Sequence, residues 1–293
     1  MKLFCENKPL YKGNLHTHTK LSDGRKPPEE VIELYKSNGY SFLAITDHRK
    51  KYPKVESDDF VIIPAGEYHH QPGHTAYHIV ALGLKDDVIT DDTTEPQEII
   101  NRVRAAGGMP VIAHPAWSLM TPDEAMDLEG WEAVEIFNGI SEGYANRGYS
   151  IEFVDAVATR GCLPLLLSSD DVHFFEHDLF QGWIVAQPDE FTSDSILEAI
   201  RAGRFYASTG PEIHQLTVED GVISVETSEA ERICFMSNVW YTATRTVRGE
   251  NGAPVTSASY TPGPKDKWVR VEVVDKNGKR AFSNFIKLEK TEG

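Results

Sequence analysis

The stretch Ser41-Phe42-Leu43-Ala44-Ile45-Thr46-Asp47-His48 joins a short apolar run to a histidine that could bind a metal. An apolar run of this length is typical of a parallel strand that is buried on both faces of its sheet. Similar runs occupy residues 60–63, 109–113, 133–137 and 163–167. We therefore expect the first two-thirds of the chain to contain a parallel sheet.

Amphipathic segments alternate with these runs and carry helix signals. Pro27-Pro28 and Thr121-Pro122 are typical of helix starts, and Gly39, Gly107 and Gly161 follow expected helix ends. The expected helices span residues 28–38, 95–106, 121–128, 150–160 and 193–202. A β/α alternation in a chain of 293 residues suits one barrel with a small additional domain.

The character of the sequence changes after about Gly210. Short alternating runs occupy residues 218–225, 233–236, 269–274 and 282–288, and Glu219-Asp220-Gly221 and Lys276-Asn277-Gly278 are typical turns. This pattern predicts a small antiparallel β-sandwich. We expect one domain at residues 1–210 and a second at 211–293, joined near Ser208-Thr209-Gly210-Pro211.

Charge and composition narrow the classes of partner. A formal net charge of −16 without a basic stripe argues against long nucleic acids and membrane surfaces. A small phosphorylated substrate stays compatible, because bound metal ions can reverse the local potential. Three cysteines, Cys5, Cys162 and Cys234, and an N-terminus without a signal-peptide core predict a reduced, cytoplasmic protein. An exposed edge strand of the C-terminal sheet would allow subunits to pair as a homo-oligomer.

Several metal-type ligands follow the apolar runs. His48, Glu67, His114 and Asp171 each come shortly after one of them. Because β/α barrels collect their active sites at the carboxyl ends of the strands, we expect these four side chains on one face. His78 differs, since it lies near the start of its own apolar run.

The segment Leu15-His16-Thr17-His18-Thr19-Lys20-Leu21-Ser22-Asp23-Gly24 contains an H-x-H pair. Side chains two residues apart in an extended segment lie on the same face, so His16 and His18 point together. Imidazoles and carboxylates without a thiolate suit Mn, Fe or Zn, and a carboxylate that can bridge suits a multinuclear site.

These motifs occur in a fixed order: H-x-H with S-D-G, T-D-H at 46–48, G-E at 66–67, His78 before a run ending at Gly83, A-H-P at 113–115 and S-D-D-x-H at 169–173. Over residues 14–173 the chain resembles the PHP (polymerase and histidinol phosphatase) metal-dependent phosphoesterases. More narrowly, it resembles the branch named for the CehA/McbA carbamate hydrolases. Residues 202–211 also look like the end of the catalytic domain in that branch.

The resemblance implies an α/β fold, a distorted TIM-like (β/α)7 barrel of PHP type, that holds two or three divalent metal ions. It also selects His78 over His74. By the family pattern, one metal would be bound by His16, His18, Glu67 and Asp171, a second by Glu67, His78 and His114, and a third by Asp23, His48 and His173.

The expected function is a metal-dependent hydrolase, most simply a phosphoesterase acting on a small phosphomonoester or phosphodiester. A hydroxide that bridges the metals beside Glu67 would attack phosphorus, with Glu67, Asp171 and His173 as the catalytic residues. No serine elbow or activated cysteine suggests a protein nucleophile.

Two alternatives stay open. The same centre could hydrolyse a carbamate or carboxylic ester: an apolar mouth would favour this, whereas basic residues around it would favour phosphate. A non-catalytic metal-binding accessory module is the third hypothesis, and the complete ligand set argues against it.

Other polar residues are weaker candidates. Arg25, Asn138 and Arg147 follow strands or lie in loops and could contact a phosphate, and His69 lies near Glu67 in sequence. For the two arginines, surface placement is the simpler interpretation. Asp47 and Asp170 adjoin expected ligands, and each could hold an imidazole N–H or serve as an ordinary turn carboxylate.

Overall fold

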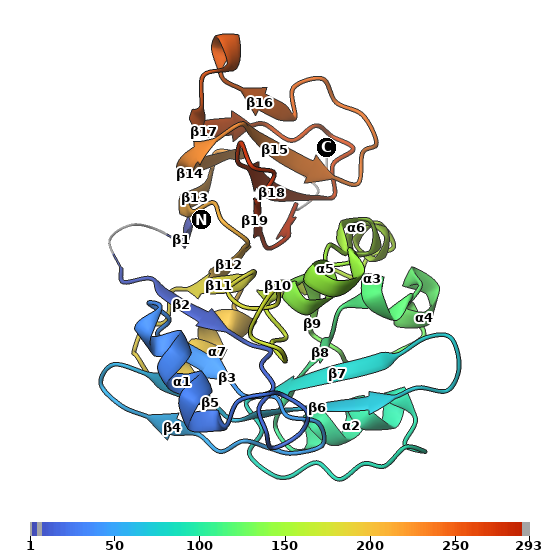
Figure 1. Ribbon diagram of the computed structural model, residues 1–293. Coiled ribbons are helices and arrows are strands. Elements are labelled where there is room, and N and C mark those ends of the chain that lie inside the picture. The colour runs from blue at the N-terminus through green and yellow to red at the C-terminus, as the bar shows by residue number, and fades with distance from the viewer. Residues whose placement is uncertain (1, 5–7, 289–293) are drawn as a thin grey trace.

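The computed structural model describes residues 2–4 and 8–288, which form seven α-helices and three β-sheets in a mixed α/β arrangement. Figure 1 shows the helices gathered in the first part of the chain, with the C-terminal strands lying above them. Cys5 lies outside the described residues. Over the described residues, no helix has the length and apolarity needed to cross a membrane.

One sheet has five strands in the order β10-β9-β8-β7-β6. Their bounds are β6 Ala65–His70, β7 Tyr77–Leu82, β8 Met109–Ile112, β9 Ala133–Asn138 and β10 Leu165–Ser169. The last three strands in chain order are mutually parallel, as expected. However, β7 runs antiparallel to both β6 and β8.

A longer sheet connects the two parts of the chain. Its first part pairs β2 (Tyr11–Asn14), β3 (Phe42–Ala44) and β5 (Val61–Ile63) in parallel, with β4 (Val55–Glu56) at the edge. The sheet continues through antiparallel strands β11 (Trp183–Ala186) and β12 (Phe205–Ser208). It ends with β19 (Arg280–Ser283), β18 (Trp268–Val274), β15 (Arg232–Ser237) and β16 (Thr246–Arg248), and β20 (Ile286–Lys287) pairs with β18.

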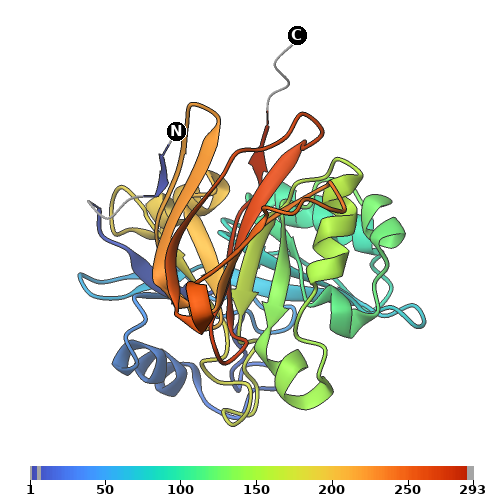
Figure 2. The ribbon, with the colours of Figure 1, turned by 90° about the horizontal axis from the view of Figure 1, so that it is seen from above.

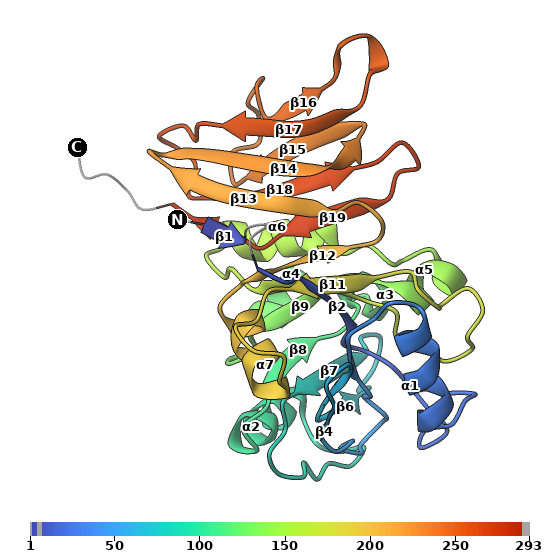
Figure 3. The ribbon, with the colours of Figure 1, turned by 90° about the vertical axis from the view of Figure 1, so that its left-hand side faces the viewer.

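The third sheet has the order β1-β13-β14-β17. It comprises β1 (Lys2–Phe4), β13 (Ile213–Glu219), β14 (Val222–Ala230) and β17 (Val255–Tyr260), and a 3-10 helix, η1 (Glu250–Gly252), precedes β17. Leu216 and Val225 of this sheet share a core with Phe235 and Val271 of the long sheet. Figures 2 and 3 show these C-terminal strands as layers over one end of the helical part.

The hairpin turn expected at Glu219-Asp220-Gly221 is confirmed. Asp220 and Gly221 both have positive φ, 49° and 78°, and they separate β13 from β14. Residues in this left-handed conformation reverse the chain in tight hairpins. The run at residues 218–225 is therefore divided between two antiparallel strands.

All five expected helices are present within a few residues of the expected bounds: α1 Pro28–Ser37, α2 Pro96–Ala105, α4 Pro122–Met126, α6 Ile151–Thr159 and α7 Ser193–Arg201. Proline begins the first three of these helices, and Thr121 and Glu124 form a reciprocal capping box on α4. Two short helices were not expected, α3 (Pro115–Ser118) and α5 (Gly139–Ala145). α3 begins directly after His114 and α5 directly after Asn138. With four and seven residues, both helices are too short to show an amphipathic repeat in the sequence.

The strands described here do not pair into a closed ring. Between the five-stranded and long sheets, the described strand pairing is limited to isolated bridges, such as His48 with Glu67 and Tyr52 with Ala65, although Ser168 of β10 also donates its hydroxyl to the carbonyl of Ser208 in β12. The α/β class is confirmed, whereas the closed, TIM-like form of the barrel stays a prediction. The domain boundary at residue 210 is likewise a prediction, and β12 and β19 pair across it.

A buried arginine ties the C-terminal strands to the helical part. Arg270 of β18 is fully buried and donates to Asp155 of α6 through Nε (2.9 Å) and Nη2 (3.0 Å). Its Nη1 donates to Glu272 at 2.9 Å. Burial disfavours the charged guanidinium, but Asp155 and Glu272 outweigh it and raise the pKa of Arg270. Removing the arginine would leave Asp155 without this cation, whereas Glu272 would keep Arg280 as a partner.

We expect Arg270→Met to lower the free energy of unfolding by about 3 kcal/mol, the lower end of the usual cost of breaking a buried ion pair, because Glu272 keeps Arg280 as a partner and Asp155 is partly exposed. Urea unfolding followed by circular dichroism measures this change. Arg232→Met is the matched control, because Arg232 of β15 pairs only with exposed Glu231 at 3.1 Å. Equal stability of the two variants would show that the buried cluster does not hold the parts together.

Candidate metal centre

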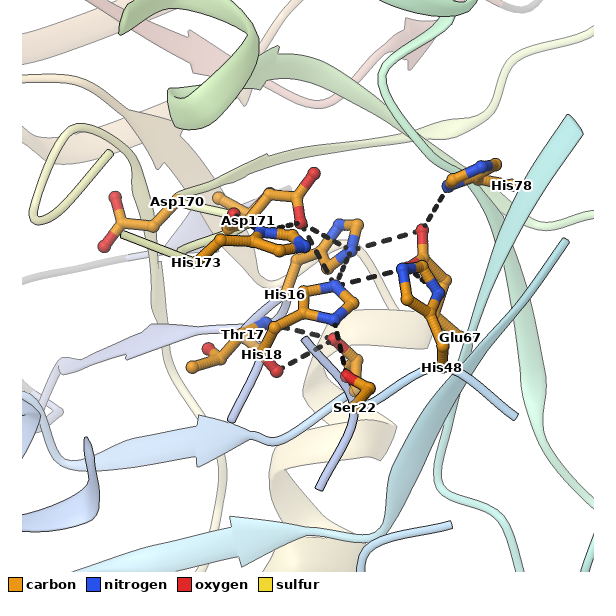
Figure 4. A network of polar contacts seen from close by, with 12 residues as sticks. His16, Thr17, His18, Ser22, His48, Glu67, His78, Asp170, Asp171 and His173 are labelled. Carbon is orange, nitrogen blue, oxygen red and sulfur yellow. Dashed lines mark hydrogen bonds and ion pairs between the residues drawn. The ribbon is translucent and has the colours of Figure 1, made fainter. Parts of the chain in front are cut away.

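The nine side chains that the sequence nominated as ligands come together in the structure. Over the described residues, three groups have ligand atoms within 4.8 Å of one another: His18, Asp23, His48 and His173; His16, His18 and Asp171; and Glu67, His78 and His114. Figure 4 shows the imidazoles of several of these residues turned toward Glu67 and Asp171. The ligand roles themselves remain predictions.

Two distant segments lie side by side to form the first part of the centre. Asp171 donates its backbone N–H to the carbonyl of His16 (2.9 Å), and His18 donates to the carbonyl of Val172 (3.0 Å). The segment after β2 therefore runs parallel to the segment after β10. The imidazole Nε2 atoms of His16 and His18 lie 3.2 Å apart, and both approach Asp171 Oδ1, at 3.1 and 3.2 Å.

Steric crowding explains the glycine of the S-D-G motif that follows the H-x-H pair. A Cβ atom on Gly24 would lie 2.5 Å from the backbone carbonyl of His18, so only glycine fits there. Asp47 accepts hydrogen bonds from the backbone and hydroxyl groups of Thr19 and Ser22. It orders this loop, and contacts no imidazole among its described bonds.

The antiparallel direction of β7 explains the position of His78. The start of β7 lies beside the end of β8, where Ala113 donates to the carbonyl of His78 at 3.0 Å. His78 and His114 therefore reach the same place although one begins a strand and the other follows one. His74, in contrast, is 85% exposed and its ring approaches Glu124.

Glu67 lies at the middle of the centre. It is 1% exposed, and each of its oxygens faces a different set of imidazole nitrogens. Oε1 lies 2.9 Å from His78, 3.4 Å from His16 and 3.7 Å from His114, and Oε2 lies 3.0 Å from His48 and 3.2 Å from His18. A carboxylate in this position can bridge two cations.

Glu135 is a functional candidate that the sequence analysis missed. It is buried in β9, with Oε1 2.8 Å from His16 Nδ1 and Oε2 accepting the backbone N–H of His114 at 2.8 Å. A ring whose Nδ1–H donates to a carboxylate offers its Nε2 lone pair to a metal. The available signal was a lone acidic residue inside the apolar run at residues 133–137.

Other imidazoles are held in the same way. His114 Nδ1 lies 3.0 Å from the hydroxyl of Ser118, and His173 Nδ1 donates to the backbone carbonyl of Asp171 at 2.8 Å. Their Nε2 atoms therefore face the cluster. Asp171 and His114 also have positive φ, 54° and 31°, a strained conformation that clusters at functional sites.

The electrostatics of the cluster favour cations. Burial disfavours protonation of His16 and His18, but neighbouring carboxylates, Asp171 foremost, outweigh it and hold their pKa values well above the ordinary range. Burial likewise opposes the charged form of Glu67, and the surrounding imidazoles hold its pKa well below the usual range. Asp171 Oδ1 is buried and accepts no hydrogen bond from the described residues. A divalent cation fits this donor set, because it would replace several protons and satisfy that oxygen.

Asp170 turns away from the cluster, as Figure 4 shows. It accepts the hydroxyl of Tyr35 at 2.6 Å and the backbone N–H groups of residues 180–182 at 2.7–2.9 Å. These bonds fix the segment that carries Asp171. Neither Asp47 nor Asp170 contacts an imidazole in its described bonds, so both act by ordering backbone.

The four expected substrate contacts lie in different surroundings. His69 adjoins the centre, with its ring 4.9 Å from that of His48, and burial together with His78 and His48 lowers its pKa to about 4. Asn138 instead donates to Glu135 and Asp171 and caps α5 by accepting from Ser141 N–H. Arg25 is exposed and paired with Glu176 at 3.0 Å, and Arg147 is exposed. Their contact with a substrate stays a prediction.

The centre opens into a cavity of about 390 Å³. Beyond the candidate ligands and Ser141, its walls are Trp117, Ile140, Tyr144, Ala145 and Phe174. The wall next to the cluster is therefore largely apolar and aromatic.

Comparison with known proteins supports the fold. No protein-family model matches the chain. The uncharacterized protein MJ1587 of Methanocaldococcus jannaschii is 27% identical over 145 residues, covering 43% of this chain and 81% of that protein. A two-domain protein from Bacteroides vulgatus, described as containing a predicted PHP-like metal-dependent phosphoesterase, matches with a TM-score of 0.55 and 14% identity. That match covers 97% of this chain and 96% of the other, so the two share a fold.

Two further solved structures are similar over about two-thirds of the chain. An amidohydrolase from Chromobacterium violaceum matches with a TM-score of 0.43 and 17% identity, over 66% of this chain and 96% of that one. A protein from Bifidobacterium adolescentis, described as a metal-dependent phosphoesterase, also has a TM-score of 0.43, with 14% identity. That match covers 67% of this chain and 98% of the other. These weaker similarities decide nothing about the fold.

We expect Glu135→Gln to weaken metal binding about 10–100-fold, because it removes the negative charge that orients His16. Competition with a chromophoric chelator measures the affinity. Glu98→Gln is the control, since Glu98 is an exposed residue of α2 that pairs with Arg102. An unchanged affinity in the Glu135 variant would remove this carboxylate from the centre.

We also expect metal binding to release protons. The raised pKa values of His16 and His18, and the pKa of His48 at about 9, keep these rings charged near neutral pH in the metal-free protein. Their protons stabilise the metal-free fold at low pH, and this contribution is lost as the pH rises through the raised values. Affinity for metal should therefore increase as the pH rises, at least to about pH 9, where His48 loses its proton.

Calorimetric titrations of metal in buffers with different ionisation enthalpies measure this release. His214→Ala serves as the control, because His214 lies outside the centre and pairs with Glu212 at 3.1 Å. Binding without proton release, with the same affinity across this range of pH, would contradict the charge balance inferred here.

Proposed function

We propose that the protein is a metal-dependent hydrolase of the PHP type, with the CehA/McbA-like branch as its nearest group, and that it cleaves a small phosphomonoester or phosphodiester. The observation that carries this proposal is the placement of Glu67, whose two oxygens face separate sets of imidazoles within 3.7 Å. The description of the Bacteroides vulgatus protein, which shares the fold, supports the same chemistry.

The donor set suits two or three ions of Mn, Fe or Zn, because it combines imidazoles with carboxylates and contains no thiolate. By this proposal, His16, His18, Glu67 and Asp171 would hold one ion, and Glu67, His78 and His114 would hold a second. Asp23, His48 and His173 would hold a third. When bound, the ions supply an acidified water and neutralise charge that develops on the ester oxygens.

The protein's own groups position the reactants. Hydrogen bonds of Asp170 and Asn138 hold Asp171 in its orientation. The backbone carbonyl of Asp171 accepts the Nδ1–H of His173. The Nε2 atom of His173 is thereby directed toward Asp23 (3.5 Å) beside the cavity. We assign His173 the transfer of a proton to the leaving oxygen only when the third position holds no ion, because its Nε2 would then carry that proton beside the cavity. A third ion held by the same Nε2 would exclude this role.

A carbamate or carboxylic ester hydrolase is the second candidate, and one observation favours it. Over the described residues, neither lysine nor arginine lines the cavity, whose wall is apolar and aromatic. A carbonyl centre needs less positive charge around it than a phosphate does. We retain the phosphoesterase as the leading proposal because bound divalent ions could supply the charge that the wall lacks.

Parallel hydrolysis assays test these proposals. The substrates are p-nitrophenyl phosphate, bis-p-nitrophenyl phosphate and 1-naphthyl N-methylcarbamate, with protein stripped of metal and reconstituted with Mn, Fe or Zn. Metal-dependent cleavage of a phosphate supports the leading proposal. Cleavage of the carbamate alone supports the second candidate, and no cleavage of any substrate favours a non-catalytic metal-binding module.

We expect Glu67→Gln to abolish the metal-dependent activity and to lower the number of bound ions, because a neutral amide is a poor bridge. Elemental analysis after gel filtration counts the ions. Glu98→Gln should retain both properties. A Glu67 variant with full metal content and normal turnover would refute the bridging assignment.

Three broader proposals accompany this function. Residues 1–210 carry the hydrolytic centre and residues 211–293 form an accessory β-sandwich domain. The substrate is a small molecule that is handled in the cytoplasm. Subunits pair through an edge strand of the C-terminal sheet, such as β17.

A further inference from the structure

Three aromatic side chains line the cavity beyond the candidate ligands. Trp117 follows His114 on α3, and its ring lies edge-on to the rings of His114 (4.9 Å, 81°) and His78 (5.9 Å, 65°). The tryptophan is 39% exposed, so part of its surface faces the open cavity. An aromatic surface therefore begins directly beside the Glu67, His78 and His114 group.

A second aromatic surface adjoins the other end of the cluster. Tyr144 of α5 is 48% exposed and its ring lies 5.0 Å from that of Phe174, which follows His173. All three aromatic residues line the same cavity, and Figures 1 and 3 show α3 and α5 close together on one side of the molecule. The two surfaces thus border one space.

The second surface is held in place before any ligand binds. Buried Asp178 accepts the backbone N–H groups of His173 (2.7 Å), Phe174 (2.6 Å) and Glu176 (3.0 Å), which fixes the loop that carries Phe174. The guanidinium of Arg25 lies 4.7 Å from the centre of the Phe174 ring. A preformed apolar wall lowers the entropy cost of binding a flat apolar group.

The charges around the cavity limit what that group can carry. Over the described residues, the lining includes Asp23, Glu67 and Asp171 but neither lysine nor arginine. The nearby Arg25 is already engaged with Phe174 and Glu176. A leaving group with an additional phosphate or carboxylate would face these carboxylates, and the charge of Arg25 beside Phe174 is already balanced by Glu176.

We propose that Trp117, Tyr144 and Phe174 select esters whose leaving group is a planar aromatic ring without a further negative charge. This inference rests on the proposed hydrolase function, with the ester group placed at the candidate metal ligands. The aromatic ring of the leaving group lies against the indole and the Tyr144–Phe174 pair. There its apolar surface is removed from solvent and it gains ring contacts.

Binding of two phosphonates to the Mn-reconstituted protein tests the inference without turnover. We expect phenylphosphonate to bind about tenfold more tightly than ethylphosphonate, which corresponds to one or two aromatic contacts. Isothermal titration calorimetry measures both affinities. Equal affinities, or no binding of either phosphonate, would overturn the selection of an aromatic group.

Rates on matched esters give a second test. Phenyl phosphate and hexafluoroisopropyl phosphate have leaving groups of similar acidity, so their ratio of kcat/KM reports recognition rather than leaving-group chemistry. We expect this ratio to favour the phenyl ester and to fall about tenfold in Trp117→Leu and in Tyr144→Leu. A ratio that the variants leave unchanged would refute the role of these rings.

Trp240→Leu and Tyr241→Leu are the matched controls, because both residues lie in the C-terminal part and are 93% and 66% exposed. They should keep the wild-type ratio. The two proposals fail in different ways: a preference for phenylphosphonate without metal-dependent hydrolysis of either ester would support the aromatic wall and refute the phosphoesterase. Metal-dependent hydrolysis of both esters with equal efficiency would support the phosphoesterase and refute the selection of an aromatic leaving group.

Discussion

The attraction between buried carboxylates and a ring of imidazoles is the constraint on which this structure depends. Glu67 and Asp171 are nearly inaccessible to solvent, and each stands within 3.7 Å of several histidines. Such a cluster is stable only if protons or metal ions balance the carboxylates, because an unpaired buried charge is costly. In the metal-free protein, the carboxylates raise the pKa values of His16 and His18, so protons on these rings balance the negative charge.

Strand direction brings the cluster together. The segment after β2 runs beside the segment after β10, and this places the H-x-H pair against Asp171. The antiparallel β7 brings the start of one strand next to the end of another, which joins His78 to His114. Glu135 in β9 then holds His16 and the backbone of His114 from behind. The centre is thus positioned by backbone pairing and by a buried acidic residue, so its geometry depends on the whole sheet.

The C-terminal strands are continuous with the part that carries the centre. β12 pairs with β11 on one side and with β19 on the other, so a single sheet passes from the first part of the chain to the last. Arg270 adds a buried ion-pair connection to α6. Over the described residues, the lining of the cavity comes from residues 23–174 and includes no side chain of these strands.

Sequence pattern by itself determined five of the seven described helices, most of the buried strands and the nine candidate ligands. Proline, capping residues and apolar periodicity act over a few neighbouring residues, so they can be read from the chain directly, and the order of the H-x-H, T-D-H, A-H-P and S-D-D-x-H motifs marked the ligands. Asn138 illustrates the limit, since its place after a strand suggested a substrate contact, whereas its bonds go to Glu135 and Asp171.

Only the tertiary structure decided how the strands pair, why His78 and not His74 reaches the centre, and what surrounds the ligands. The direction of β7, the support from Glu135 and the aromatic wall of Trp117, Tyr144 and Phe174 all depend on residues far apart in sequence. Local propensity carries no information about such contacts. They arise when separate segments pack together, because burial of apolar surface and pairing of buried polar groups must be satisfied over the whole fold at once.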